Sequence, residues 1–244
     1  MTRIPRQRQL LDMLAADGQI LVTRAAAALA VSDDTIRRDL ADLDARGLLH
    51  KTHGGAVTRD LGQLPRTGRA QLLAAEKARI ARAAAAAIPA GGILVLDAGS
   101  TTLALAEALA VPATVITNSL DIAQRLDRRE EIRLVLAGGT WDARQRLFAG
   151  AAARATLRRY RADLVILGAC AVDAAGVTAT HEQDGDMKRT MLDIGDTAWL
   201  LADHLKFARR EPHAVAPLDR FARIHTDRAP DDDRIAPDRL HIAP

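Results

Sequence analysis

The sequence predicts an α/β protein of two domains, a small and mainly helical one followed by a larger one built on a mostly parallel β-sheet. Residues 31–49 form a short amphipathic pattern with arginines on its polar side. From residue 93 onward, short apolar stretches alternate with segments of helical pattern, which is typical of parallel strands covered on both faces. Residues 58–75 contain two glycines and a proline without a clear strand, which indicates a linker. We therefore expect domains at 1–57 and 76–244.

The first domain is organised around one helix, expected from about Asp33 to Arg46. Ser32 can cap its first turn, and Gly47 can adopt the left-handed conformation that ends a helix. One side forms an apolar stripe made of Ile36, Leu40 and Leu43. The other side presents Thr35, Arg37 and Arg38. Such a helix suits a DNA major groove, although an ordinary surface helix would show the same pattern.

The flanking segments favour the DNA-binding interpretation. Upstream, a periodic helix runs from about Pro5 to near Gly18, and a short alanine-rich helix follows at 24–30, which Thr23 would cap. Downstream, residues 48–57 read as two short strands around Gly54-Gly55, a hairpin that would form a wing. This order predicts a winged helix-turn-helix. Donors for DNA phosphates on the wing are Lys51, Thr52 and His53.

Residues 3–57 resemble the N-terminal domain of the DeoR family of bacterial repressors. The signature of that family is a serine, two variable residues and Thr-hydrophobic-Arg-Arg-Asp-Leu, present here as Ser32 and Thr35–Leu40. The wing matches as residues 51–57, Lys-Thr-His-Gly-Gly-Ala-Val. The resemblance implies a regulator that binds double-stranded operator DNA as a homo-oligomer, a dimer or a tetramer. The residues expected to contact DNA are Ser32, Thr35, Arg37, Arg38, Lys51 and His53.

Composition limits the alternatives. Residues 1–60 hold nine Lys/Arg and eight Asp/Glu, so DNA binding must depend on where the arginines point and should be steeply salt-sensitive. The single cysteine excludes an intramolecular disulfide and suits a reducing cytosol. No apolar run is long enough to cross a membrane and no signal peptide is evident, so we expect a cytoplasmic protein. The histidines lack metal-ligand spacing, and we expect neither a metal nor a cofactor.

The second domain is expected to be Rossmann-like, with ligands at the carboxyl ends of its parallel strands. The loop at 97–102, Asp-Ala-Gly-Ser-Thr-Thr, lies between an apolar strand and a helix N-terminus. Its glycine, hydroxyls and unpaired helix N–H groups would form a cradle for a phosphate. The next two strands are followed by similar loops at 117–119 and 138–140. Simple helix capping would also explain each of these loops.

Residues 76–244 resemble the effector domain of the same family, which is similar in fold to ribose-5-phosphate isomerase. The resemblance implies a phosphorylated sugar or related metabolite as effector. Carried over by position, the phosphate would contact Gly99, Ser100, Thr101 and Thr102. The residues expected around the sugar are Asp97, Asn118, Lys188 and Lys206, and Gly139 belongs to a matching loop. Either lysine could close over a phosphate, or simply lie on a solvated face.

One departure from the family pattern bears on function. The loop that usually reads Gly-Ala-Asp-Gly is here Gly168-Ala169-Cys170-Ala171, so a cysteine replaces an acid that the related isomerases use for proton transfer. A thiol is a poor acid–base group at neutral pH. We therefore expect no enzyme, but a repressor of a sugar operon that the effector releases from DNA. The alternatives are a sugar-phosphate isomerase with a DNA-binding domain, and an activator or architectural protein whose second domain serves only assembly.

Overall fold

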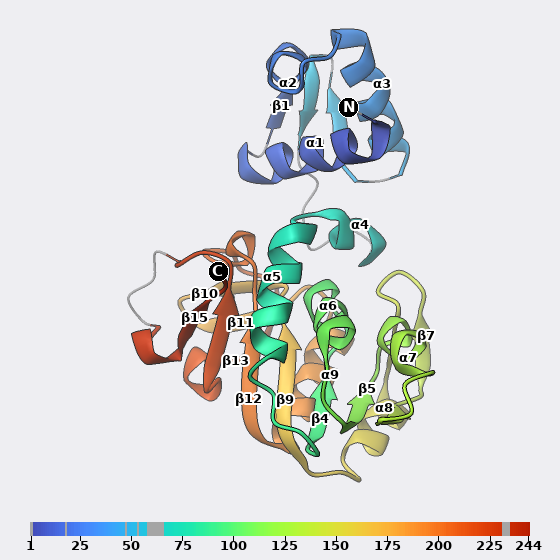
Figure 1. Ribbon diagram of the computed structural model, residues 1–244, viewed down its shortest axis with the longest axis vertical. Coiled ribbons are helices and arrows are strands. Elements are labelled where there is room, and N and C mark those ends of the chain that lie inside the picture. Colours follow the sequence, from blue (N-terminus) through green and yellow to red (C-terminus); the bar gives the residue numbers. More distant parts are fainter. Residues whose placement is uncertain (1, 18, 47, 53, 58–65, 231–234) are drawn as a thin grey trace. The chain divides into compact units, whose positions relative to one another are not determined.

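The computed structural model describes residues 2–17, 19–46, 48–52, 54–57, 66–230 and 235–244 (Figure 1). The chain divides into two compact units, residues 1–74 and 75–244, and each is described by itself. The segment 58–75, expected to be a linker, contains the helix α4 (Arg66–Gln71). No helix in the described ranges is long and apolar enough to span a bilayer.

The first unit is a winged helix-turn-helix, as predicted. Its helices are α1 (Arg3–Asp17), α2 (Val22–Leu29) and α3 (Asp33–Ala45). Its antiparallel sheet has the order β1-β3-β2, with strands β1 (Gln19–Leu21), β2 (His50–Thr52) and β3 (Gly55–Val57). The hairpin of β2 and β3 was predicted, but β1 was not. A Cβ at Gly55 would lie 1.7 Å from the carbonyl oxygen of Ile20, so the wing needs glycine where β1 and β3 meet.

One cap prediction in this unit was wrong. Helix α2 begins at Val22, and Leu21 occupies the N-cap position without a side-chain hydrogen bond, so Thr23 lies inside the helix. The backbone explains the difference, because the N–H of Val22 donates to the carbonyl oxygen of Gly54 in the wing at 2.9 Å. The wing therefore satisfies the first N–H of α2, and the helix begins one residue before the expected cap.

The second unit is built on a seven-stranded sheet of order β15-β14-β12-β9-β4-β5-β6, in which every neighbouring pair is parallel. The strands are β4 (Ile93–Leu96), β5 (Ala113–Thr117), β6 (Ile132–Leu136), β9 (Ala162–Gly168), β12 (Gly195–Leu201), β14 (Arg223–Thr226) and β15 (Leu240–Ile242). From β4 the chain proceeds through β5 to β6, and then returns to the opposite side of β4 at β9. The strand order therefore reverses between β4 and β9, and this switch point is where such sheets bind ligands.

Helices cover both faces of this sheet (Figure 1). On one face α5 (Ala74–Ala85), α6 (Ser100–Ala108) and α7 (Leu120–Leu126) pack with strand residues such as Leu94 and Leu96. On the other face α8 (Ala151–Leu157) and α9 (Glu182–Asp193) pack with residues such as Val95. Successive residues of β4 thus enter two separate cores, which is why the strand is apolar throughout.

One apolar stretch of the second unit, residues 213–218, does not join the parallel sheet as the alternating pattern predicts. Strand β13 (His213–Ala216) instead joins β10 (Ala171–Asp173) and β11 (Gly176–Ala179) in a small antiparallel sheet. An apolar pattern shows that a segment is buried but not which strand it pairs with. A hairpin of β7 (Thr140–Asp142) and β8 (Leu147–Ala149) was also not predicted.

The strand β14 carries a buried histidine, His225. His225 stacks on His241 with ring centroids 5.0 Å apart, and its ring nitrogens have no hydrogen-bond partner within the described ranges. Burial, with the nearby charges of His241 and Arg223, lowers the pKa of His225 to about 4. Its usual pKa is near 6.5, so the unfolded chain binds this proton first as the pH falls.

We therefore expect the unfolding free energy to fall by about 2 kcal/mol between pH 7 and pH 4.5 because of His225 alone. Urea unfolding of the wild type and of His225→Leu at both pH values measures the part of the loss that is due to His225, because all other titrating groups are common to the two proteins. The loss on acidification should be smaller in the variant by that amount. Equal losses in both proteins would show that His225 is not the group responsible.

Candidate functional site

The recognition helix α3 presents its arginines to solvent as predicted. The Ser32 hydroxyl accepts a hydrogen bond from the backbone N–H of Thr35 at 3.3 Å, so Ser32 caps the helix. Arg37 pairs with Asp33 and Arg38 pairs with Asp34, each one turn away along the exposed face. Exposed pairs of this kind are weak. The guanidinium groups of Arg37 and Arg38 therefore remain at the surface and available to another partner.

The wing carries the remaining DNA-binding candidates. Lys51 is exposed on β2, where it lies opposite Ala56 of β3. His53 and the expected helix cap Gly47 lie outside the described residues. Thr52 ends the strand, opposite Gly55.

Sequence reasoning missed the role of Asp39, the buried acid of the Arg-Arg-Asp-Leu motif. Asp39 points inward, is only 3% exposed and forms an ion pair with Arg6 of α1. Gln7 donates to Asp39 at 3.4 Å and to Asp42 at 3.0 Å. These contacts fasten α1 to α3, so Asp39 sets the position of the helix that carries Arg37 and Arg38. The helical period places Asp39 beside Leu40 and Leu43, and that signal could have identified it.

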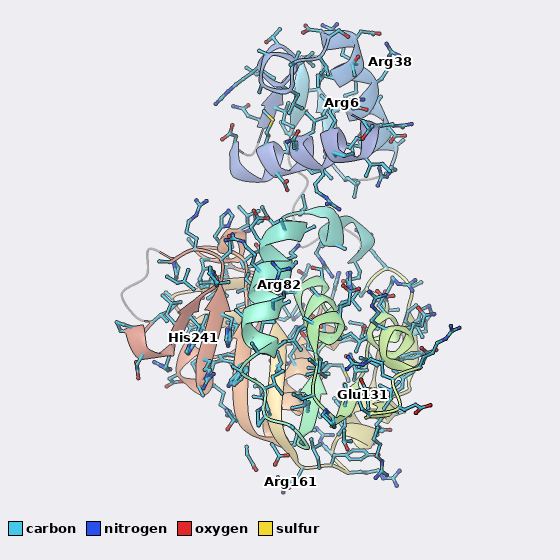
Figure 2. All side chains as sticks on the ribbon, in the orientation of Figure 1. Arg6, Arg38, Arg82, Glu131, Arg161 and His241 are labelled. Carbon is cyan, nitrogen blue, oxygen red and sulfur yellow. The ribbon has the colours of Figure 1, made fainter. Side chains whose placement is uncertain are left out.

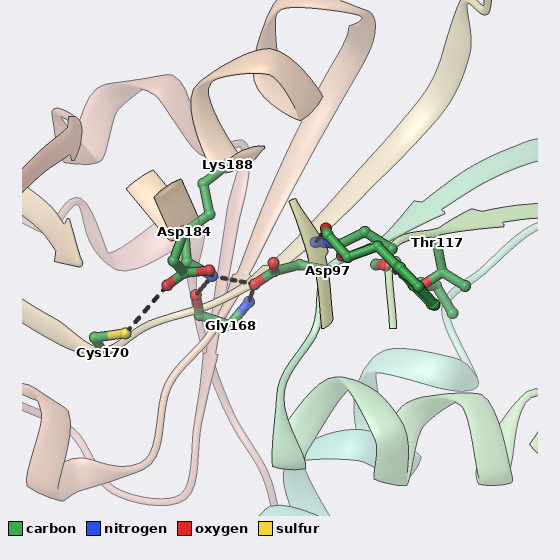
Figure 3. Close-up of polar contacts among 9 residues, drawn as sticks. Asp97, Thr117, Gly168, Cys170, Asp184 and Lys188 are labelled. Atoms are coloured by element: carbon green, nitrogen blue, oxygen red, sulfur yellow. Dashed lines mark hydrogen bonds and ion pairs between the residues drawn. The ribbon is translucent and has the colours of Figure 1, made fainter. Parts of the chain in front are cut away.

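The second site lies at the switch point of the large sheet (Figure 3). Asp97 follows β4 and is completely buried, and its Oδ2 accepts from the backbone N–H of Gly168 at the end of β9, at 3.1 Å. Lys188 of α9 donates to the same Oδ2 atom and to the carbonyl oxygen of Gly168, the latter at 3.2 Å. Its ammonium also lies 3.5 Å from Asp184 Oδ1. The structure therefore brings Asp97 and Lys188 into contact and adds Asp184, which sequence reasoning did not select.

This buried cluster has two carboxylates and one ammonium. Burial is the main reason that the pKa of Asp97 is raised to about 6, with Asp184 adding to the effect and Lys188 opposing it. Burial disfavours the charged form of Lys188 as well, but attraction to Asp184 and Asp97 outweighs it and raises the pKa of this lysine. Lys188 is therefore charged at neutral pH, and its charge is already compensated by acids.

Cys170 lies beside the cluster. Its Sγ is 3.6 Å from Asp184 Oδ2, within reach of a weak S–H donor (Figure 3). An acid at this position would add a third carboxyl group around one lysine. The thiol avoids that repulsion.

The loop after β4 carries the polar residues that were expected to form a phosphate cradle. Gly99 occupies the N-cap position of α6 without a side-chain cap, so Ser100, Thr101 and Thr102 form the first turn. A Cβ at Gly168 would lie 3.7 Å from Asp97 Oδ2 and 4.0 Å from Thr102 Cγ2, which places this turn beside the cluster. In the described part of the chain, three buried oxygens have no hydrogen-bond partner at the ends of β4 and β5: Asp97 Oδ1, Thr102 Oγ1 and Asn118 Oδ1. Such atoms are costly unless something bonds to them.

The other candidate residues have different positions. Asn118 follows β5, next to β4 in the sheet, and donates from Nδ2 to the carbonyl oxygen of Phe148 in β8 at 3.0 Å. Gly139 has a positive φ of 130° and packs so closely on β8 that a Cβ would lie 2.5 Å from the carbonyl oxygen of Ala149. Lys206 lies on the turn His204–Lys206 after β12, two strands away from β4. Gly139 thus shapes the hairpin, and Lys206 lies at the same sheet edge without joining the cluster.

Comparison with known proteins identifies the family. Residues 6–61 match the model of the DeoR-like helix-turn-helix domain, and residues 73–228 match that of the DeoR C terminal sensor domain. The chain belongs to the DeoR family. It is therefore a DNA-binding transcriptional regulator with a small-molecule sensor domain, and not an enzyme.

Relatives of this DeoR-family regulator match along most of their length. The HTH-type transcriptional repressor GlcR of Bacillus subtilis is 34% identical over 91% of this chain and 87% of its own. The L-fucose operon activator of Haemophilus influenzae is 31% identical over 92% of both chains. The glycerol-3-phosphate regulon repressor of Escherichia coli is 30% identical over 94% of this chain and 93% of its own.

The solved structure of ribose 5-phosphate isomerase A from Methanocaldococcus jannaschii aligns with 54% of this regulator and 53% of its own chain. The identity is 16% and the TM-score is 0.40. A likeness of this size supports no conclusion about the regulator. The assignment of the second unit to an α/β sensor domain depends on its own parallel sheet and on the family match.

Proposed function

We propose that this regulator represses a carbohydrate operon by binding its operator through α3 and the wing, and that a phosphorylated sugar bound in the second unit relieves the repression. The DNA contacts are made by Ser32, Thr35, Arg37, Arg38, Lys51 and His53. The functional boundaries follow the sequence, with DNA binding in residues 1–57, a linker at 58–75 and effector binding in 76–244. The protein acts in the cytoplasm as a symmetric oligomer, whose two-fold axis matches repeated half-sites in the operator.

The observation that carries the proposal is the polar cluster at the β4–β9 switch point. Buried oxygens of Asp97, Thr102 and Asn118 have no hydrogen-bond partner among the described residues, and sugar hydroxyls would supply the donors that they require. The first turn of α6, at Gly99, Ser100 and Thr101, offers backbone N–H groups to a phosphate at one end of the same sugar. The names of the relatives, which refer to fucose and to glycerol-3-phosphate, support the same class of effector.

The position of Lys188 refines this proposal. Because two carboxylates already compensate its charge, Lys188 serves the effector by keeping Asp97 ionised and oriented rather than by closing over the phosphate. Lys206 and Gly139 contribute from the loops after β12 and β6, at the same edge of the sheet.

Thermal unfolding with a panel of pentose and hexose phosphates tests the effector class. A phosphorylated sugar at 100 times its Kd should stabilise the protein by about 2.7 kcal/mol, whereas the unphosphorylated sugar should not. In Ser100→Glu the stabilisation should disappear, because a carboxylate would repel the phosphate at the α6 N-terminus while favouring the helix itself. Ser100→Ala is the matched control and should keep most of the response.

Hits from this panel are then added to the protein bound to fragments of promoters near its own gene, in a mobility-shift assay. Release of the DNA supports a repressor that the effector inactivates, and tighter binding supports an activator. If a phosphorylated sugar stabilises Ser100→Glu as much as the wild type, the phosphate does not bind at the N-terminus of α6. The absence of any response across the panel would reject phosphorylated sugars as the effector class.

A further inference from the structure

A hollow of about 260 Å³ lies between the first turns of α1 and the recognition helix α3. Its lining residues are Arg3, Arg6, Thr35, Arg38 and Asp39. Arg6 of α1 and Arg38 of α3 are labelled in the N-terminal unit in Figure 2. Two of the lining residues, Thr35 and Arg38, are proposed DNA contacts. Arg3 and Arg6 belong to α1, which is not among the proposed DNA contacts.

The lining is positively charged. It carries three guanidinium groups against the single carboxylate of Asp39, and that carboxylate is already engaged by Arg6 and Gln7. Asp39 is also nearly buried, with a side chain only 4% exposed. It therefore orients Arg6 at the floor of the hollow and presents little negative charge to an approaching anion.

The arginines at the rim can exchange their partners. Arg3 pairs with Asp42 at 2.7 Å, with side chains 61% and 35% exposed, and Arg38 pairs with Asp34 on the open surface. Exposed ion pairs contribute little, and a phosphate offers guanidinium groups a stronger bidentate partner. Asp42 would keep other partners if Arg3 turned away, because Gln7 donates to it at 3.0 Å and Arg46 lies 3.7 Å from it.

We propose that this hollow binds a backbone phosphate of double-stranded DNA, so that Arg3 and Arg6 of α1 extend the contact made by the recognition helix. The inference rests on the proposed function, because it places the phosphate beside the groove face formed by Thr35 and Arg38. Arg3 is the rim contact and Arg6 is a positioning residue held by Asp39. The subsite contributes affinity and register on the duplex and carries no sequence preference of its own.

The test is the salt dependence of binding to a random-sequence duplex, which needs no knowledge of the operator. Arg3→Gln removes the rim contact from an exposed position. Arg8→Gln removes the same charge from an exposed position about 140° further around α1, outside the hollow. Losing one phosphate contact should reduce the magnitude of the slope of log K against log salt by about 0.9 for each bound subunit. At 0.1 M salt this weakens binding about eightfold for each bound subunit. Arg8→Gln should leave the slope at the wild-type value.

A specific promoter fragment, once found, should lose affinity for Arg3→Gln by the same factor, since the contact is independent of sequence. Equal slopes for Arg3→Gln and the wild type, or equal losses in Arg3→Gln and Arg8→Gln, would overturn the subsite while leaving the proposed function intact. A wild-type protein that binds no duplex at any salt concentration would overturn both.

Discussion

Arg38→Ala is expected to abolish specific operator binding while leaving the stabilisation by sugar phosphates unchanged. Arg38 lies on the exposed face of α3, opposite Ile36, Leu40 and Leu43, which are all fully buried. A good arginine contact to a base is worth about 1–3 kcal/mol, so a symmetric protein on two half-sites would lose about 2–6 kcal/mol. Mobility shifts on a promoter fragment measure the loss, and thermal shifts with a phosphorylated sugar show that the sensor domain still works.

Asp34→Asn is the opposing control for this experiment. It removes the partner of Arg38 and one negative charge from the same turn of the helix, so DNA binding should stay equal or become tighter. Both residues are exposed, and neither substitution leaves a buried charge without a partner. A variant Arg38→Ala that still shifted the promoter fragment like the wild type would show that the groove face of α3 has been assigned incorrectly.

The sequence predicted the recognition helix well because its signals are local. Ser32 caps the helix and the apolar stripe is buried, and both follow from short-range spacing. The start of α2 was misassigned because Val22 finds its partner in the wing, more than thirty residues later. Strand β1 was missed for the same reason, since three residues become a strand only by pairing with β3. Local patterns cannot show such partners.

The switch-point site shows a similar limit. The carboxyl-edge rule and the family pattern together selected Asp97, the loop up to Thr102, and Lys188, and the structure places these beside one another. Neither the rule nor the family pattern selected Asp184, because an acid four residues before a lysine on a helix usually forms an ion pair on the surface. Only the burial of α9 against β9 and β12 turns that pair into part of a buried cluster. Lys188 is therefore the buried counter-ion of Asp97, and the alternative of a lysine on a solvated helix face was wrong.

Lys188→Met is expected to destabilise the second unit by about 3–5 kcal/mol at neutral pH, because it leaves the buried carboxylate of Asp97 without a counter-ion. Both tryptophans, Trp141 and Trp199, lie in this unit, so tryptophan fluorescence during urea unfolding reports on it alone. Lys206→Met is the matched control. It removes a lysine from a partly exposed turn after β12 and should cost less than about 1 kcal/mol.

The pH dependence of the same variant identifies the cause of the loss. The pKa of Asp97 is already raised to about 6 by burial, and without Lys188 it should rise further. A raised folded-state pKa means that stability is present below the unfolded value and is lost as the pH rises through the folded value. The unfolding free energy of Lys188→Met should therefore fall from pH 5 to pH 8 by up to about 1.4 kcal/mol per pH unit.

Adding Asp97→Asn should remove that slope, because the protein then has no buried carboxylate at the end of β4 to ionise. A slope that persisted in the double variant would assign the titration to Asp184 instead.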